Sequence, residues 1–171
     1  MTKTRGFSLI ELMITIAVAA IILALAAPAF TDTISKKRVS AETSDLLGDL
    51  ALARSESLTR GARVVLCPSN TGTGCTSTAW NLGRIIFVDT DPNGTVDTGE
   101  TILRVGAPLD AASALTVSGG SVDRISYLPS GAISDDSRNA LTVCRSGYKG
   151  RSVAINPMGQ IHVTQTSSTC S

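Results

Sequence analysis

The sequence predicts an α+β fold, in which a long N-terminal α-helix precedes an antiparallel β-sandwich-like domain with two disulfides. A predominantly apolar run extends from residue 7 to residue 27, and apolar residues then recur at three- and four-residue steps, as on one face of a helix. From Ala62 the pattern changes to short β-rich runs, and all the cysteines lie there. We therefore divide the chain into a leader-like segment at 1–6, a membrane segment at 7–30, an amphipathic helix at 31–61 and a β-domain at 62–171.

The segment 7–30 is long enough to span a bilayer, because a helix rises about 1.5 Å per residue and the hydrocarbon core is about 30 Å thick. Lys3 and Arg5 precede it, as in a secretory signal, and Ala24-Leu25-Ala26 matches an A-x-A cleavage site. The apolar run is too long for such a signal, however, and it contains Glu11. We therefore expect a retained membrane helix.

Glu11 is the only charged residue of the apolar run. A carboxylate inside a membrane helix costs roughly 2.5–3.5 kcal/mol on insertion scales, so such a residue is expected to have a partner. Cleavage between Gly6 and Phe7 would leave the helix intact and create an amino group on Phe7. That amine and Glu11 would be one helical turn apart and could neutralise each other, within one chain or between neighbours.

After Pro28 the helix is predicted to bend without ending, because proline removes one hydrogen bond and crowds the preceding turn. Gly61 is suited to the left-handed conformation that commonly follows a helix. Charged residues stand between the apolar positions of this amphipathic part. The apolar positions are Ile34, Val39, Leu46, Leu47, Leu50 and Leu58.

The N-terminal segment Lys3-Thr-Arg-Gly6-Phe7-Ser-Leu-Ile-Glu11-Leu-Met-Ile resembles the class III signal of type IV prepilins and type II secretion pseudopilins. The resemblance implies that a prepilin peptidase cuts between Gly6 and Phe7 and methylates Phe7, and that Glu11 guides docking onto the neighbouring subunit. Pro28 stands where pilins often carry a helix-kinking proline. The chain is thus identified as similar to minor subunits of the GspH/FimT (FimU-like) type.

The resemblance also implies a location and a set of partners. The chain would cross the bacterial inner membrane once, with its C-terminal domain in the periplasm, before incorporation into a filament. Its partners would be other minor and major pilins or pseudopilins, the prepilin peptidase and the inner-membrane assembly platform. We expect a minor pilin that primes assembly or forms the tip of a type IV pilus; the alternative is a minor pseudopilin of a type II secretion system.

Runs bounded by Gly, Pro, Asn or Ser predict about eight strands in one β core. They are Arg63–Cys67, Arg84–Val88, Thr101–Val105, Leu115–Val117, Val122–Tyr127, Leu141–Cys144, Ser152–Ile155 and Ile161–Val163.

The cysteines number four, an even count that favours disulfides in an oxidising compartment. Among the three connectivities we favour Cys67–Cys75, which closes a short Gly-rich loop, and Cys144–Cys170, which fastens the polar C-terminal tail to a strand. Zinc is the rival interpretation, but the chain has no C-x-x-C pair and its one histidine, His162, stands alone.

The segment from residue 89 to 100 has the spacing of a calcium loop, with candidate ligands at Asp89, Asp91, Asn93, Asp97 and Glu100. Its flanks are predicted strands, and Pro92-Asn93-Gly94 is typical of a turn. We favour a turn between two strands and expect no required cofactor; calcium binding is the alternative.

Catalysis has little support, because the chain lacks a nucleophile elbow, a phosphate-binding glycine loop and a zinc-protease motif. We therefore expect that the protein is not an enzyme.

Nucleic-acid binding is the remaining alternative, since some FimT-like minor pilins capture DNA through a G-R-x-R motif. Here Lys149-Gly150-Arg151-Ser152-Val153 has valine in place of the second arginine. Lys149 and Arg151, with Arg138 and Arg145, could form a small positive patch. From Ala62 onward, basic and acidic residues are equal in number, so the domain lacks the net positive charge that phosphate binding favours.

Overall fold

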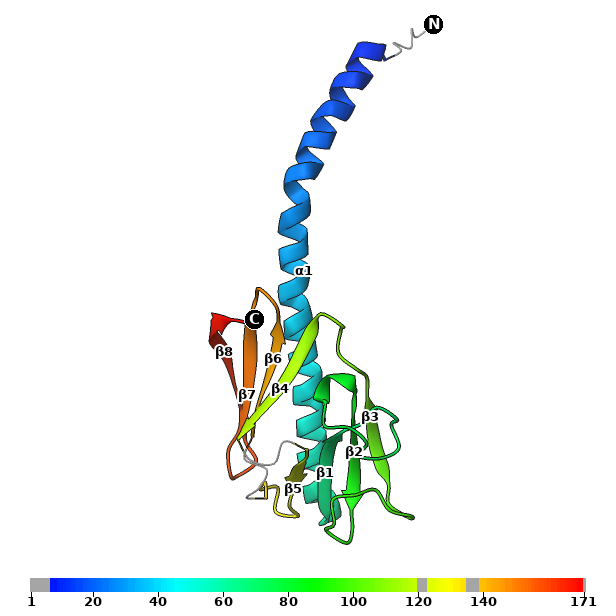
Figure 1. The fold of residues 1–171 in the computed structure, drawn as a ribbon, viewed down its shortest axis with the longest axis vertical. Helices are drawn as coiled ribbons and strands as arrows, with labels where there is room; N and C mark the ends of the chain where they lie inside the picture. Colours follow the sequence, from blue (N-terminus) through cyan, green and yellow to red (C-terminus); the bar gives the residue numbers. More distant parts are fainter. Residues whose placement is uncertain (1–6, 120–122, 135–138, 171) are drawn as a thin grey trace, which may run out of the picture. The chain divides into compact units, whose positions relative to one another are not determined.

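The computed structural model describes residues 7–119, 123–134 and 139–170, with the side chains of 25–29 and 139 left out. One helix, α1 (Leu9–Arg60), precedes eight strands and a short 3-10 helix, η1 (Trp80–Leu82) (Figure 1). The strands are β1 (Arg63–Pro68), β2 (Arg84–Asp89), β3 (Ile102–Gly106), β4 (Ser113–Gly119), β5 (Ile125–Tyr127), β6 (Asn139–Arg145), β7 (Lys149–Ile155) and β8 (Ile161–Thr169). The predicted α+β fold class is confirmed.

The chain divides into two compact units, Met1–Lys37 and Arg38–Ser171, which are described separately. In the first unit, every described side chain from Phe7 to Ala24 is exposed. None of the described helical stretches has the combination of length and hydropathy that crossing a bilayer requires. The predicted membrane segment 7–30 includes residues 25–29, whose side chains lie outside the described part of the chain.

Helix α1 continues through Pro28, as predicted, and ends at Arg60. The predicted bend at Pro28 stays a prediction, because the side chain of Pro28 lies outside the described residues. Gly61 follows the helix with a φ of 61°, the left-handed conformation expected of a residue that ends a helix.

In the second unit the strands form two four-stranded antiparallel sheets with the orders β3-β2-β1-β5 and β4-β6-β7-β8. The turns of α1 beyond Arg38 run beside both sheets (Figure 1). One core joins the helix to both sheets: it includes Leu46, Leu50 and Ala53 of α1 with Leu66, Tyr127 and Val143 of the strands. The helix therefore supplies the apolar surface on which each sheet buries one face.

The first sheet also has a buried outer face. Successive side chains of a strand point to opposite faces, so Val64 and Leu66 join the main core while Val65 and Cys67 face away from it. Val65, Cys67, Ile85 and Phe87 form a second apolar cluster, against which Cys75 and Val96 pack from the loops. This explains why β1 and β2 read as nearly continuous apolar runs.

The longest departure from prediction is the C-terminal strand. Instead of ending at Val163, β8 runs to Thr169 and pairs with β7 along most of its length. Its residues are mostly polar and exposed. The threonines are favourable in a strand, but the segment shows no alternation between apolar and polar positions that would predict one. The polar C-terminal tail is thus an edge strand of the second sheet.

A buried ion pair fixes α1 against the first sheet. The carboxylate of Asp49 on α1 accepts a hydrogen bond from Nε of Arg84 in β2, and Nε of Arg104 in β3 lies 3.0 Å from its other oxygen. The side chains of Asp49 and Arg84 are 1% and 3% exposed. In the sequence Asp49 is one of the charged residues between the apolar positions of the helix, so the helical pattern alone does not reveal that it is buried.

Replacing Asp49 by Asn should destabilise the β-domain, because the Arg84 guanidinium would stay buried without a counter-charge. Breaking a buried pair by removing one partner costs about 3–5 kcal/mol. Thermal unfolding of the full-length protein in detergent should show a loss of that order. The control Glu56→Gln removes an exposed pair with Arg60 on the same helix and should cost less than about 1 kcal/mol. Equal stability of the two variants would contradict the importance of the Asp49 pair.

Candidate functional site: the N-terminal assembly segment and the surface of the β-domain

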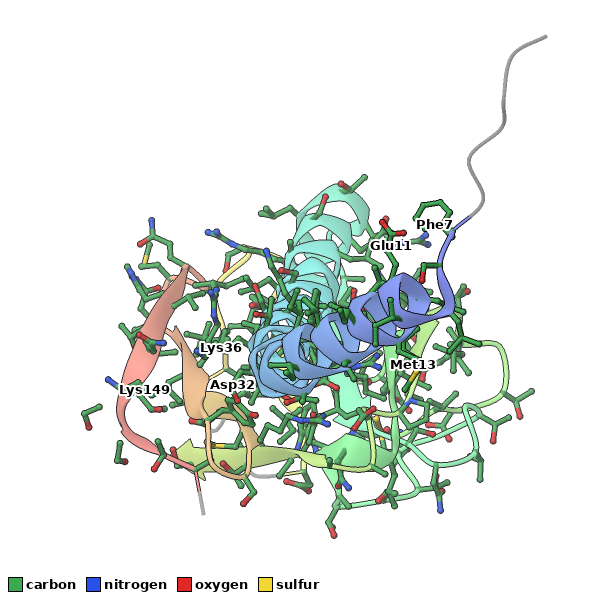
Figure 2. All side chains as sticks on the ribbon, turned by 90° about the horizontal axis from the view of Figure 1, so that it is seen from above. Phe7, Glu11, Met13, Asp32, Lys36 and Lys149 are labelled. Carbon is green, nitrogen blue, oxygen red and sulfur yellow. A yellow bond between two sulfur atoms is a disulfide. The ribbon has the colours of Figure 1, made fainter. Side chains whose placement is uncertain are left out.

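The candidate assembly residues lie at the N-terminal end of α1. Figure 2 labels Phe7 and Glu11 there. Phe7 is 82% exposed, and Glu11 lies in the first helical turn. A carboxylate in that turn is favoured by the helix dipole, since the first backbone N–H groups have no partner within the helix.

The helix begins at Leu9 rather than at Phe7. The carbonyl of Ser8 accepts hydrogen bonds of 3.1 Å from the backbone N–H groups of Glu11 and Leu12, so Ser8 is the N-cap residue of the helix. Serine is a preferred residue at that position. In the full chain the nitrogen of Phe7 belongs to the peptide bond with Gly6, which lies outside the described residues, so the proposed pairing of a Phe7 amine with Glu11 stays a prediction.

Two disulfides join Cys67 to Cys75 and Cys144 to Cys170, the pairing that the sequence favoured. The first fastens the loop after β1 over the outer apolar cluster of the first sheet. The second joins β6 to the residue after β8, and Cys170 also forms an isolated bridge with Ser146. The free C-terminal edge of the second sheet is therefore held covalently.

Gly150 has a structural role beside the second disulfide. A Cβ atom at this position would lie 2.9 Å from Sγ of Cys144, 3.0 Å from Sγ of Cys170 and 2.6 Å from the carbonyl oxygen of Val143. Only glycine fits there without a shift of the backbone or of the disulfide. The glycine of the K-G-R segment is thus explained by packing.

The two candidate DNA-binding residues flank this glycine on β7. Lys149, labelled in Figure 2, and Arg151 are both exposed and lie two residues apart, on one face of the strand. Arg145 does not extend this patch as an unpaired charge, because its Nη1 donates to Oδ1 of Asp110 at 2.9 Å. Arg138 lies outside the described residues. The DNA-binding role of Lys149 and Arg151 stays a prediction.

The acidic loop joins β2 to β3, as the turn interpretation expects. Oxygens of Asp89, Asp91 and Glu100 lie within 4.8 Å of one another, whereas Asp97 is not part of this cluster. Calcium requires six to eight oxygen ligands at about 2.3–2.6 Å. The cluster therefore brings together three of the predicted carboxylate ligands, fewer than the six to eight oxygens that calcium requires.

Hydrogen bonds inside the loop use these carboxylates. The buried carboxylate of Asp89 accepts from the backbone N–H groups of Asn93 and Gly94, at 3.2 and 3.1 Å. One oxygen of Glu100 accepts from the backbone and hydroxyl groups of Thr90, and the Asn93 amide donates to Asp91 and to Asp97. Burial raises the pKa of Asp89, and the nearby Glu100 carboxylate adds to this rise, while the Gly94 and Asn93 N–H groups and Arg63 oppose it.

A second polar cluster lies near the first turn of α1 in the β-domain unit. Asp110 accepts from the backbone N–H of Ala112 and from Arg145, and Arg38 of α1 lies 3.6 Å from its other oxygen. These donors lower the pKa of Asp110 from its usual value, the Ala112 N–H group most and Arg145 next. The cluster connects α1, the loop before β4 and the end of β6.

The fold and these sites define a class of protein. A long helix with an exposed, apolar N-terminal part and a disulfide-closed β-domain on its C-terminal part is the architecture of a pilin-like subunit. The chain belongs to the family described as type II transport protein GspH, whose model matches residues 42–159. Residues 1–27 match the prokaryotic N-terminal methylation motif.

Solved structures share this fold. A crystal structure of the type IV minor pilin FimU of Pseudomonas aeruginosa aligns with a TM-score of 0.62 and 16% identity, covering 78% of this chain and 96% of that chain. The minor pseudopilin EpsH from the type 2 secretion system of Vibrio cholerae aligns with a TM-score of 0.54 and 12% identity, covering 77% of this chain and 99% of that chain.

The family and the methylation motif establish the chain as a minor pilin or pseudopilin, a structural subunit and not an enzyme. The motif implies a prepilin with an N-terminal membrane anchor, which a prepilin peptidase processes and which assembles with other pilins. The predicted family and subunit class are thereby confirmed.

Proposed function

We propose that this minor pilin primes the assembly, or forms the tip, of a type IV pilus. The observation that carries the proposal is the apolar helix segment from Phe7 to Ala24, whose described side chains are all exposed and contain a single charge. Fully burying one large apolar side chain contributes about 1.5–3 kcal/mol, so the segment gains most from packing beside other apolar helices. Such helices are what a filament core provides.

The β-domain would face outward from that core and contact partner minor subunits. A minor role suits a domain with two disulfides and a long polar edge strand. The likeness to a type IV minor pilin supports the pilus. The likeness to a secretion-system pseudopilin supports the alternative, in which the same helix chemistry builds a type II secretion pseudopilus.

In this proposal the Glu11 carboxylate and the methylated amine of Phe7 pair within and between subunits. The subunit would leave the inner membrane laterally from the assembly platform and join other minor and major pilins. Its C-terminal domain would lie in the periplasm until then.

Replacing Glu11 by Ala should leave membrane insertion intact but reduce filament incorporation by roughly tenfold or more, the factor that corresponds to about 1.4 kcal/mol of lost pairing. The test uses a strain that lacks the gene, complemented with wild type, with Glu11→Ala or with the control Thr15→Val, an uncharged change one turn further along the helix. Subunit content of sheared filaments, surface piliation and secretion of exported proteins are measured together.

We expect piliation to fall in the Glu11→Ala strain while its secretion stays at the wild-type level. The Thr15→Val strain should keep both wild-type piliation and wild-type secretion. Incorporation that is unchanged by Glu11→Ala would show that the charge pair is dispensable. A loss of secretion with normal piliation would assign the subunit to a type II secretion system instead.

We further propose that the acidic loop closes on its own hydrogen bonds and needs no calcium. Millimolar CaCl₂ should then leave the Tm of the full-length protein in detergent unchanged relative to the same concentration of MgCl₂. A site with a Kd of about 10⁻⁴ M would instead raise Tm by about 3–6 °C at roughly 1 mM calcium. A saturable rise of that size, absent from an Asp91→Asn variant, would establish the calcium alternative.

A further inference from the structure

A charged cavity of about 340 Å³ opens beside α1 in the β-domain unit. Arg38, Glu42 and Asp45 of α1 line one side of it, and Arg84, Arg104 and Asp110 line the other. All six belong to the compact unit Arg38–Ser171. What the cavity can bind depends on which of these charges already have partners.

Each basic residue that lines the cavity is already paired. Arg84 and Arg104 share the carboxylate of Asp49, a buried residue of α1. Arg38 lies 3.6 Å from Asp110. Asp110 in turn is the most fully satisfied acid of the group, because Arg145 and the backbone N–H of Ala112 also donate to it.

Two acidic residues of the cavity keep free hydrogen-bonding capacity. The Glu42 side chain accepts the backbone N–H of Asp110 at 3.1 Å through Oε1. The residue is 7% exposed, and its Oε2 is buried without a hydrogen-bond partner among the described residues. Asp45 lies three residues further on the same helix face, is exposed, and makes no ion pair or hydrogen bond with a described residue.

A buried carboxylate oxygen without a donor is costly, and buried charges in native proteins are normally paired. Among the described residues, no donor offsets this cost at Glu42 Oε2. A cation entering the cavity would remove this cost once the Glu42 side chain turns its buried Oε2 toward the cavity, because an ammonium carries three N–H donors and bonds between ionised groups are the strong ones. An anion is less favoured in the cavity, because the guanidinium groups that line it already pair with carboxylates.

We propose that this cavity receives a basic side chain, a lysine or arginine of a neighbouring filament subunit, which donates to Glu42 Oε2 and pairs with Asp45. The inference rests on the proposed function only in taking the partner to be another filament subunit. Lys or Arg at a subunit surface has the reach to enter such a cavity while its stem lies along apolar atoms of the rim, such as those of Val105 and Pro108.

The test measures peptide binding to the full-length protein in detergent micelles at low salt. The probe is acetyl-Ala-Lys-Ala-amide, and the matched control is acetyl-Ala-Gln-Ala-amide. Binding is followed as a saturable shift of Tm. The wild-type protein should respond to the lysine peptide and not to the glutamine peptide. No saturable response to the lysine peptide up to tens of millimolar, or an equal response to both peptides, would overturn the proposal.

The decisive variant is Glu42→Gln. Its amide oxygen can still accept the Asp110 N–H, while the charge and the acceptor Oε2, which an NH₂ group replaces, are lost. The free variant should be as stable as wild type or more stable, while its affinity for the lysine peptide falls by about tenfold. The control Glu56→Gln changes a partly exposed carboxylate elsewhere on α1 and should keep wild-type affinity.

A lower Tm for Glu42→Gln with unchanged peptide affinity would show that Glu42 only supports the fold and would overturn the binding role. The peptide result does not depend on which filament the subunit joins. Failure of the piliation assay with intact peptide binding would therefore remove the proposed function and leave the cavity assignment standing.

Discussion

The organisation of this molecule depends on how the apolar side chains of one helix are covered. Beyond Arg38 the chain itself covers most of them: Leu46, Leu50 and Ala53 are buried under two sheets. Between Phe7 and Ala24 no described part of the chain covers them. A helix whose apolar surface is left bare over so many turns is stable only in lipid or against other helices, and that requirement explains why the chain belongs to a family of subunits that assemble.

Polar residues decide how the covered part of the helix is held. The Asp49 carboxylate pairs with two arginines from adjacent strands. It therefore fixes the rotation of α1 against the first sheet, next to the buried leucines Leu46 and Leu50 of the same helix. Arg54 acts one turn further on, where its guanidinium donates to the carbonyl oxygens of Gly131 and Met158 at 3.1 and 2.9 Å. Glu42 and Asp45, by contrast, have acceptor capacity that the domain does not use, which is why we propose a basic partner for them.

Much of the fold could be predicted from local patterns, because each element is specified by residues close in sequence. The three- and four-residue apolar spacing predicted the helix, and Gly61 its end; the strand pattern and the loop lengths predicted eight strands and the cysteine pairing. What failed depends on distant residues. Asp49 and Glu42 look like surface residues until Arg84 and Asp110 are placed beside them, and the polar strand β8 is specified by pairing with β7 rather than by its own composition.

Cleavage between Gly6 and Phe7 would leave the whole apolar helix on the mature subunit and create the amine that neutralises Glu11. Intact mass and N-terminal sequencing of the protein extracted from membranes test this most directly. We predict a chain that begins with methylated Phe7. A chain that begins after Ala26 or Ala27 would have lost the helix segment that assembly requires, and would make the protein a conventionally secreted one.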